Sequence, residues 1–471
     1  MRAWPFAAPV ALLFLVGCTA NAPISTAAAK LPAATVISGP ISTPPACRAV
    51  TGPFHPGEPS LAVDPKAPTH LVATWQQLGT PVGLGNVVAV SQDGGRQWVR
   101  EMLPGLTTCS GGPYVSATDP WVSIGPDHTV YVSSLLTRLP QQGVTTHDVA
   151  VNVLPDGGTG WRPPVVVETQ PAPPTVVDKE GILADPRRPG WAYLVWVEYG
   201  ATGSGVSSVD QVFFSRTSDG GTTWSVPAAI YGGGDEAQQN QLLMTADGTL
   251  IDVFVEGSSL PGDPHPPPIP VAIRVIRSTD QGRTWSQPIE AARFSYTNAI
   301  DPGSGAQLRF FGQDITAASA GNAVYVSWEV TYPGIESTIW VARSEDRGVH
   351  WSAARAVVRE KSEAFLPTLA VAGDTTIGVL WFDFRAFASG SATLDTDVWF
   401  SSSKDRAAQW STRQLAGPFD LRTAPAARYG PFLGDYMGLV GLPDGFAAAF
   451  VQAKPASKNG ATDVFFLKIP G

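Results

Sequence analysis

The chain has little charge, few cysteines and no sustained helical periodicity. Asp, Glu, Lys and Arg make up 15% of its 471 residues, and only 3 residues are Cys. Turn-forming residues are instead abundant, with Gly 48 and Pro 43. A chain of this length that lacks helical patterning and is rich in turn formers is predicted to consist of many short strands.

The scarcity of basic residues limits the class of partner. Lys and Arg number 31 against 40 Asp and Glu, which gives a formal net charge of -9. This charge argues against nucleic acid, or the surface of an anionic membrane, as a partner. The 6 histidines are scattered without the spacing of a metal site or a catalytic triad. The sequence therefore predicts no metal-ligating set and no organic cofactor.

One eight-residue phrase recurs six times along the chain. In every copy a Trp stands five residues after an Asp, and successive aspartates lie 59 to 66 residues apart. A period of this size indicates one supersecondary unit per repeat. The copies are SQDGGRQW at Ser91–Trp98, LPDGGTGW at Leu154–Trp161, TSDGGTTW at Thr217–Trp224, STDQGRTW at Ser278–Trp285, SEDRGVHW at Ser344–Trp351 and SKDRAAQW at Ser403–Trp410.

Each copy predicts a compact hairpin turn. The Asp side chain can accept hydrogen bonds from backbone N–H groups ahead of it, Gly takes φ > 0 without a Cβ clash, and the Trp buries its ring beside the turn. Two copies depart from this pattern, because Leu154 cannot donate the hydrogen bond of a Ser or Thr and Ala407 replaces the turn Gly. We expect these two turns to be the looser ones.

This phrase is the Asp box, or BNR repeat, and from Gly57 to the C-terminus the chain resembles the sialidase-like Asp-box β-propellers of secreted bacterial proteins. The resemblance implies an all-β fold, a propeller of four-stranded blades with the Asp-box turns together on one face. In that family the active site lies on the opposite face. The same scaffold carries sialidases, other glycosidases and non-catalytic binding proteins, so the fold alone does not assign an activity.

The segments between the boxes predict the number of blades. Seven pairs of inner strands and seven third strands can be counted, but only six boxes, because the chain ends after Ile469 before another fourth strand could form. The segment Thr35–Ser42 is predicted to supply that strand, since closing the ring with both termini removes an exposed edge. We therefore favour seven blades. Six blades is the alternative, because sialidases themselves have six.

The N-terminus predicts export. Residues 1–18 read as a signal peptide whose apolar run is too short to span a bilayer and ends in Leu15-Val16-Gly17-Cys18, which resembles a bacterial lipobox. By that resemblance Cys18 would be acylated, residues 19–34 would form a flexible tether, and the only membrane contact would be this anchor in the cell envelope. The alternative is cleavage near Thr19–Ala22 and free secretion. Residues 35–471 would form a single propeller domain.

Two cysteines remain in the exported chain, Cys47 and Cys109. A leftover pair in an exported protein usually forms a disulfide. It would close a long loop around the first repeat and so restrict the unfolded chain. We therefore predict a disulfide between Cys47 and Cys109.

Charged residues recur where inner strands begin and second strands end. On the face opposite the boxes these positions would converge on the central channel. Crowded, partly desolvated carboxylates have raised pKa values, as a general acid needs, and the same ring would suit a structural Ca²⁺. The candidate catalytic residues are Asp119, Asp178, Asp314, Asp383, Asp435 and Tyr436. The candidate substrate-binding residues are Glu58, Glu198, Glu329 and Arg385.

The resemblance to sialidases can be compared residue by residue. In that family three arginines hold the anionic substrate, a Tyr helped by a Glu is the nucleophile, and an Asp is the acid/base. This chain has Glu58-Pro59 at the first inner strand and no Arg-Ile-Pro motif there, and only Arg309, Arg385 and Arg428 stand near strand ends. An acidic funnel would also repel sialic acid. Sialidase activity itself is not expected.

Two classes of function remain open. The chain could be a glycoside hydrolase that acts on extracytoplasmic glycans, or a non-catalytic propeller that presents its funnel to a glycan or an envelope protein. The resemblance favours hydrolysis, whereas the missing arginines and the lack of an assembled nucleophile–base motif favour binding. In either case we expect a monomer.

Overall fold

The computed structural model describes the chain from residue 31 onward, with gaps. Within it Pro32–Gly471 form one compact unit. No helix among the described residues is long and apolar enough to cross a membrane. The described residues are 31–39, 41, 55–78, 85–138, 146–158, 160–171, 175–202, 205–206, 211–232, 237–257, 269–296, 298–311, 314–330, 338–359, 363–373, 375–427, 430–457 and 460–471.

Three earlier predictions fall on residues outside these ranges. Cys18 and the signal peptide are not described, so export and lipid anchoring stay predictions. Cys109 is buried and disulfide-bonded. Cys47 is outside the described residues, so its assignment as the partner of Cys109 stays a prediction.

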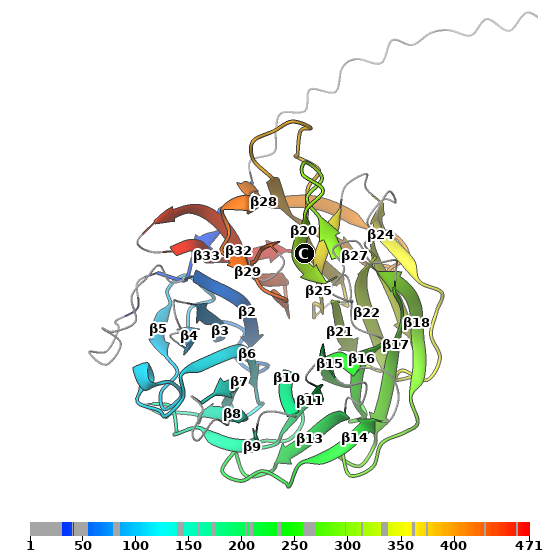
Figure 1. Cartoon of the computed structure of the whole chain (residues 1–471). Helices are drawn as coiled ribbons and strands as arrows, with labels where there is room; N and C mark the ends of the chain where they lie inside the picture. Colours follow the sequence, from blue (N-terminus) through cyan, green and yellow to red (C-terminus); the bar gives the residue numbers. More distant parts are fainter. Residues whose placement is uncertain are drawn as a thin grey trace, which may run out of the picture. The chain divides into compact units, whose positions relative to one another are not determined.

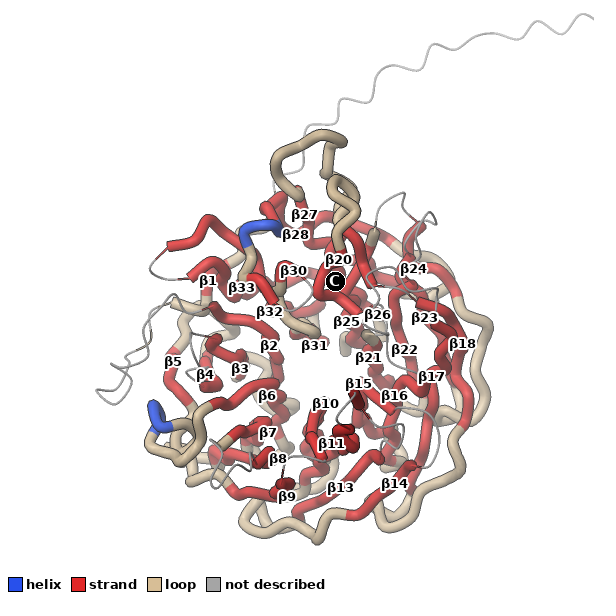
Figure 2. The backbone as a smooth tube through the Cα atoms, in the orientation of Figure 1, coloured by secondary structure: helices blue, strands red, loops and turns tan. Residues whose placement is uncertain are grey.

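Seven antiparallel sheets of four strands surround a central axis as the blades of a propeller (Figure 1). The fold is all-β, and only the short 3₁₀ turns Thr108–Ser110 and η3 (Leu421–Thr423) interrupt the strands in the described part of the chain. This confirms the all-β propeller and seven blades rather than six. Figure 2 shows that the first strand of every blade lies nearest the axis.

The blades follow one another along the chain. Blade 1 is β2 (His55–Val63), β3 (Leu71–Leu78), β4 (Gly85–Ser91) and β5 (Val99–Met102); blade 2 is β6 (Ser116–Ile124), β7 (Val130–Thr137), β8 (Thr146–Leu154) and β9 (Val165–Pro171). Blade 3 is β10 (Thr175–Ala184), β11 (Ala192–Thr202), β13 (Gln211–Thr217) and β14 (Ala228–Gly232), with the short β12 (Gly205–Val206) beside β11. Blade 4 is β15 (Ala237–Met244), β16 (Leu250–Gly257), β17 (Ile269–Ser278) and β18 (Ile289–Tyr296).

The remaining blades keep the same order. Blade 5 is β21 (Ile315–Ala320), β22 (Ala323–Val330), β23 (Thr338–Ser344) and β24 (Arg355–Arg359); blade 6 is β25 (Ala364–Val371), β26 (Ile377–Asp383), β27 (Asp395–Ser403) and β28 (Ser411–Asp420). Blade 7 is β31 (Gly438–Leu442), β32 (Gly445–Ser457) and β33 (Gly460–Pro470), completed by β1 (Thr35–Val36).

The last blade is closed by the N-terminal segment, as predicted, but the strand is only Thr35–Val36, and Pro40 and Ser42 of the predicted segment Thr35–Ser42 lie outside the described residues. β1 pairs antiparallel with β33, with Thr35 opposite Phe466, and the Ile37 N–H donates to the Val464 carbonyl at 2.9 Å. Ser38 continues the contact, because its hydroxyl accepts the Val464 N–H at 2.9 Å. The two ends of the chain thus share one sheet, which leaves no open edge in the ring.

The core lies between neighbouring blades, because both faces of each sheet are covered. The second strands of blades 1, 3, 5 and 6 each bury a tryptophan completely, namely Trp75, Trp196, Trp328 and Trp381. Apolar residues on the facing blades pack around them in successive clusters. This interblade packing explains why the middle strands are buried along almost their whole length.

The box turns have the predicted hydrogen bonds. In the third box the Asp219 carboxylate accepts the N–H groups of Thr222 and Thr223 at 3.0 Å each and the Thr217 hydroxyl at 2.8 Å. The Thr217 oxygen in turn accepts the Gly221 N–H at 3.0 Å. Each box joins the third and fourth strands of its blade, so all six turns lie at the same end of the antiparallel blades, which we call the box face.

The sixth box is not looser in its hydrogen bonds. Ala407 adopts φ 64°, and its N–H still donates to the Ser403 hydroxyl at 3.0 Å, while Asp405 accepts the Gln409 N–H at 2.9 Å. The Ala therefore takes the left-handed conformation that Gly takes elsewhere. The second box cannot be compared in the same way, because Thr159 lies outside the described residues.

Two insertions stand at the other end of the blades, opposite the box face. The hairpin β19 (Asn298–Ile300) and β20 (Gln307–Phe311) joins blades 4 and 5, and β29 (Ala426–Ala427) with β30 (Gly430–Pro431) joins blades 6 and 7. β20 contacts β30, and the Arg422 guanidinium binds both oxygens of Asp301, with Nε–Oδ2 at 2.9 Å and Nη2–Oδ1 at 3.0 Å. This ion pair ties the two insertions together.

Candidate active site in the centre of the propeller

A ring of side chains is set by bulges in the innermost strands. In β2, β6, β10, β15 and β25 the register with the second strand shifts near the strand's start, and a non-glycine residue within that shift has a positive φ. These residues are Glu58 (φ 55°), Asp119 (50°), Lys179 (53°), Gln239 (60°) and Leu366 (57°). Asp314 and Tyr436 precede the innermost strands of blades 5 and 7.

The left-handed conformation of these residues is energetically unfavourable. A non-glycine residue at positive φ costs on the order of 1 kcal/mol, and such strain gathers at functional sites. The sequence does not indicate it at Glu58, Lys179, Gln239 or Leu366, because Glu, Lys, Gln and Leu are not turn-forming residues; Asp119 alone is of a type that often takes positive φ. The bulges turn the side chains of several blades towards one another at the axis, on the face opposite the boxes.

Asp435 is the ion-paired centre of this group. Lys179 Nζ lies 2.8 Å from Asp435 Oδ2, and Arg309 Nη1 from β20 lies 3.1 Å from Asp435 Oδ1. Burial by itself would raise the pKa of Asp435, but the charges of Lys179 and Arg309 outweigh it and lower that pKa. Asp435 is therefore ionised in the folded protein, and both neighbouring cations bind it.

The other carboxyl groups are shifted in the opposite direction. Burial, reinforced by Asp119 and Asp435, raises the pKa of Glu58 well above its ordinary value. Burial also raises the pKa of Glu180, with Asp119 the next cause, and that of Asp314, with Asp435 the next cause. Desolvation thus favours protonation wherever no cation compensates for it.

Asp119 combines partial exposure with a pKa close to neutrality. Burial and the charge of Asp178 raise its pKa to about 6, although Lys179 opposes the shift. Its side chain is half-buried, whereas those of Glu58 and Glu180 are almost fully buried. Asp119 is therefore the carboxyl group of this set that can meet a ligand and still hold a proton near pH 6.

Asp178 is fixed by its own contacts. Tyr199 donates its hydroxyl proton to Asp178 Oδ2 at 2.5 Å, and the Lys179 N–H donates to Asp178 Oδ1 at 2.8 Å. The Asp119 and Asp178 carboxyl groups act on each other electrostatically, so they share one environment. Asp178 is thus an oriented acceptor beside a proton donor.

Tyr436 and Trp121 form the aromatic part of the site. Their ring centroids are 4.7 Å apart, and Trp121 is half-buried. The Tyr436 hydroxyl has no hydrogen-bond partner among the described residues. Burial, followed by the charges of Glu58 and Asp119, raises the pKa of Tyr436 well above its ordinary value. The hydroxyl is therefore neutral, which is the opposite of an activated nucleophile.

Six of the predicted site residues thus lie together: Glu58, Asp119, Asp178, Asp314, Asp435 and Tyr436. We call these six, with Lys179, Glu180 and Arg309, the central cluster. Lys179 and Glu180 are not among the predicted site residues, yet they follow Asp178 directly in the sequence. Arg309 is near the site only because the β19–β20 hairpin carries it there, and no pattern in the sequence indicates that hairpin.

Four predicted residues have other surroundings. Asp383 binds Arg385, with Asp383 Oδ2 to Arg385 Nη2 at 2.5 Å, and the guanidinium stacks 3.7 Å from the centre of the Trp399 ring. Glu198 accepts the Trp196 indole N–H at 3.0 Å, and Glu329 accepts the backbone N–H of Leu366. These groups hold second strands and the bulge at Leu366 in place. Arg428, the third arginine near a strand end, lies outside the described residues.

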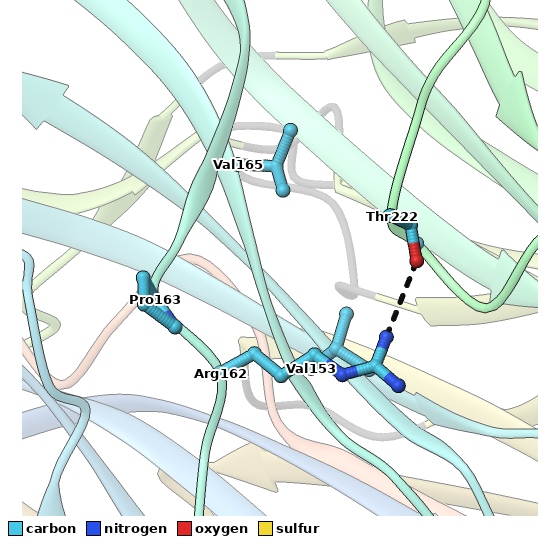
Figure 3. A pocket seen from close by; sticks show the side chains of 6 residues that line it. Val153, Arg162, Pro163, Val165 and Thr222 are labelled. Atoms are coloured by element: carbon cyan, nitrogen blue, oxygen red, sulfur yellow. Dashed lines mark hydrogen bonds between the residues drawn. The ribbon is translucent and has the colours of Figure 1, made fainter.

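A separate shallow pocket of about 300 Å³ lies between blades 2 and 3 on the box face (Figure 3). It is lined by Val153, Arg162, Pro163, Val165, Gly221 and Thr222. Arg162 is engaged there, because its guanidinium donates to the Gly220 carbonyl at 3.0 Å. The pocket is mostly apolar and offers no acid, base or nucleophile.

Metal binding finds no support in the described part of the chain. No group of three or more His, Cys, Asp or Glu side chains there is arranged to hold a metal ion. The structural Ca²⁺ that the acidic ring would suit therefore stays a prediction.

Comparison with known proteins gives similarity in fold only. No family model and no curated protein matches the chain. A solved protein of unknown function from Dyadobacter fermentans is 15% identical over 89% of this chain and 97% of its own, with a TM-score of 0.48. A Penicillium chrysogenum α-L-arabinanase complexed with arabinobiose is 13% identical over 93% and 99%, with a TM-score of 0.43. A Ruminococcus gnavus intramolecular trans-sialidase is 13% identical over 89% and 95%, with a TM-score of 0.41. At these values the similarity assigns no activity.

Proposed function

We propose that this protein is a glycoside hydrolase whose active site is the central cluster. The observation that carries the proposal is the pair Asp119 and Asp178, a half-buried carboxyl with a pKa of about 6 beside an oriented second carboxyl. Glycoside hydrolysis needs such a pair, one group to protonate the leaving oxygen and one to act on the sugar carbon. The strained bulges around the axis also favour a functional site over a purely structural one.

The roles follow from the surroundings of each group. Protonated Asp119 donates its proton to the glycosidic oxygen as the bond to the sugar carbon breaks. Asp178, held by Tyr199 and the Lys179 N–H, stabilises the positive charge that develops on the sugar ring. Water then bonds to the sugar carbon and gives one of its protons to the Asp119 carboxylate, which restores the protonated acid. The half-buried Trp121 offers an aromatic face on which a sugar ring can stack.

Sialosides are not the proposed substrate. Both cations of the central cluster, Lys179 and Arg309, bind Asp435. A substrate carboxylate would have to compete with Asp435 for them and would meet the surrounding carboxyl groups. We propose a glycan without a carboxylate at the reacting sugar.

The proposed setting is the cell envelope. We propose that the chain is exported, acylated on Cys18 and tethered by residues 19–34, with Cys47 as the disulfide partner of Cys109. Mass spectrometry of the mature protein tests these points, because acylation adds lipid mass to an N-terminal Cys18. An N-terminus beyond Cys18 would instead indicate free secretion, and an alkylatable Cys47 would contradict the disulfide.

The direct test is hydrolysis of a panel of chromogenic glycosides by the full chain. We expect turnover of at least one neutral or cationic glycoside, and a loss of about 10²–10⁴-fold in kcat for Asp119→Asn. The matched control is Asp219→Asn, the same change in a box turn, which should keep kcat. Equal activity of wild type and Asp119→Asn would contradict the assigned role.

One observation favours a second function, glycan or protein binding without turnover. Asp435 forms ion pairs with both Lys179 and Arg309, an arrangement that also occurs in structural ion-pair networks. Saturable binding of a glycan on an array, together with no hydrolysis of any glycoside in the panel, would favour this alternative.

A further inference from the structure

We propose that the central cluster binds a protonated amine, and that its ligand is a glycan bearing an unsubstituted amino sugar. This inference rests on the proposed function for its choice of a glycan. It goes beyond that function by specifying that the ligand group recognised by the cluster is positively charged.

Carboxyl groups outnumber cations in the central cluster. The central cluster contains six carboxyl groups against the two cations Lys179 and Arg309, and both cations bind the same carboxylate, Asp435. The other carboxyl groups, those of Glu58, Asp119, Asp178, Glu180 and Asp314, have no Lys or Arg ion pair among the described residues. An ammonium group placed among these carboxyl groups would accept none of their protons but would favour their ionised form, because a nearby positive charge opposes the protonation that burial favours.

Several buried polar atoms of the central cluster lack a hydrogen-bond partner among the described residues. Glu58 Oε2 and both carboxylate oxygens of Glu180 are buried and have no hydrogen-bond partner among the described residues. The Tyr436 hydroxyl shares this property. Buried polar groups in native proteins are nearly always paired, so an unpaired set of this size points to a ligand that supplies donors. An ammonium group supplies three donors and no acceptor.

The Tyr436 hydroxyl and the Trp121 ring lie beside these carboxyl groups. The charges of Glu58, Asp119, Glu180 and Asp435 all act on the Tyr436 hydroxyl, which places it among these carboxyl groups. The Trp121 ring packs on Tyr436 and remains half-buried. Aromatic faces attract cations, so the ring pair adds to the preference for an ammonium over a neutral substituent.

The test compares ligands that differ only at the amine. We would titrate the full chain with glucosamine, galactosamine and their N-acetyl forms by calorimetry at low salt. The expected result is a Kd at least tenfold lower for an amine than for its N-acetyl counterpart. Glu180→Gln, or Glu58→Gln if that variant does not fold, should abolish the difference.

The matched control is Asp252→Asn. Asp252 is also a buried carboxyl, but it lies inside β16 and no charged group acts on it. This variant should keep the preference for the amines. Equal affinity of amines and N-acetyl forms, or no binding of either, would overturn the inference.

The outcomes separate this inference from the proposed function. Preferential binding of amines without hydrolysis of any glycoside would support the amine site and contradict the hydrolase. Hydrolysis of neutral glycosides without any preference for amines would support the hydrolase and contradict the amine site. Tight binding of spermidine with no binding of either amino sugar would contradict the assignment to a glycan.

Discussion

Carboxyl groups at the two faces of the propeller differ in their pKa shifts. On the box face Asp219 is exposed enough to be solvated, and hydrogen bonds from Thr223, Thr217 and Thr222 outweigh its partial burial and lower its pKa. At the axis on the other face, burial and neighbouring carboxyl groups raise the pKa values of Glu58 and Asp119. Asp219 is ionised and satisfied by its own turn, whereas Glu58 and Asp119 are desolvated and have no ion pair among the described residues. Asp435, which binds Lys179 and Arg309, is the exception at the axis.

The comparison shows which carboxylates serve the fold and which serve a ligand. A box aspartate is held by backbone N–H groups within four residues, so its environment is local. A carboxyl of the central cluster owes its environment to several blades, and Glu58 and Asp435 are far apart in sequence. Four predictions test this contrast, from the largest expected effect to the smallest.

The largest effect is expected at Asp435. Asp435→Asn leaves Lys179 and Arg309 buried near each other without their shared carboxylate, which should lower the free energy of unfolding by about 3–5 kcal/mol. Asp219→Asn, which weakens one box turn, should cost about 1 kcal/mol. Chemical denaturation of both variants measures the difference. Similar losses for the two would mean that the central ion pairs are no more important to stability than a single turn.

The second effect concerns the pH dependence of turnover. If Asp119 is the general acid, its protonated form is active, so kcat/KM should fall tenfold per pH unit above about 6. Lys179→Met removes a positive charge that lowers the pKa of Asp119, so the descending limb should move to higher pH. Rates measured from pH 4 to 9 with a substrate found in the glycoside panel check both points. If the descending limb lies at the same pH in Lys179→Met as in wild type, the general acid is a group other than Asp119.

Much of the fold could be predicted from the sequence, but only part of the site. The period of the boxes and the alternation of strands indicate seven blades, and Thr35–Ser42 could be assigned because the last repeat lacks a strand. The ring acids could be proposed because charge is scarce. The positive φ of Glu58 or Lys179 could not be predicted, since these residue types have no preference for it. Arg309 could not be assigned to the site either, because a hairpin between two blades brings it there.

The third prediction concerns Asp252, a carboxyl group whose pKa is raised by burial without a contribution from a neighbouring carboxyl group. Asp252 on β16 is fully buried, and burial raises its pKa well above the ordinary value. In the other six blades the matching position, defined by pairing with the innermost strand, is apolar: Ala73, Val132, Leu194, Val326, Val379 and Ala448. Asp252→Val should therefore stabilise the protein by about 1–3 kcal/mol.

The stability difference between Asp252→Val and wild type should depend on pH. A group whose pKa is raised by folding contributes stability that is present at low pH and is lost as pH rises towards its folded pKa. Asp252→Val removes that loss, so its advantage over wild type should be larger at pH 8 than at pH 5. Denaturation at the two pH values measures it. If Asp252→Val is more stable than wild type by the same amount at both pH values, folding does not change the pKa of Asp252.

The smallest effect is expected in the sixth box turn, where Ala407 has φ 64°. Ala407→Gly should relieve about 1–2 kcal/mol of left-handed strain and lose about 0.8 kcal/mol of methyl burial, leaving a net gain of about 0.2–1.2 kcal/mol. The reverse change in the fourth box, Gly282→Ala, should destabilise instead, because a Cβ there would lie 2.3 Å from Phe214 ring atoms. Thermal unfolding of both variants, which gives their Tm values relative to wild type, tests these two expectations. A lower Tm for Ala407→Gly would mean that the packing of the methyl group outweighs the backbone strain, and that this turn has adapted to its alanine.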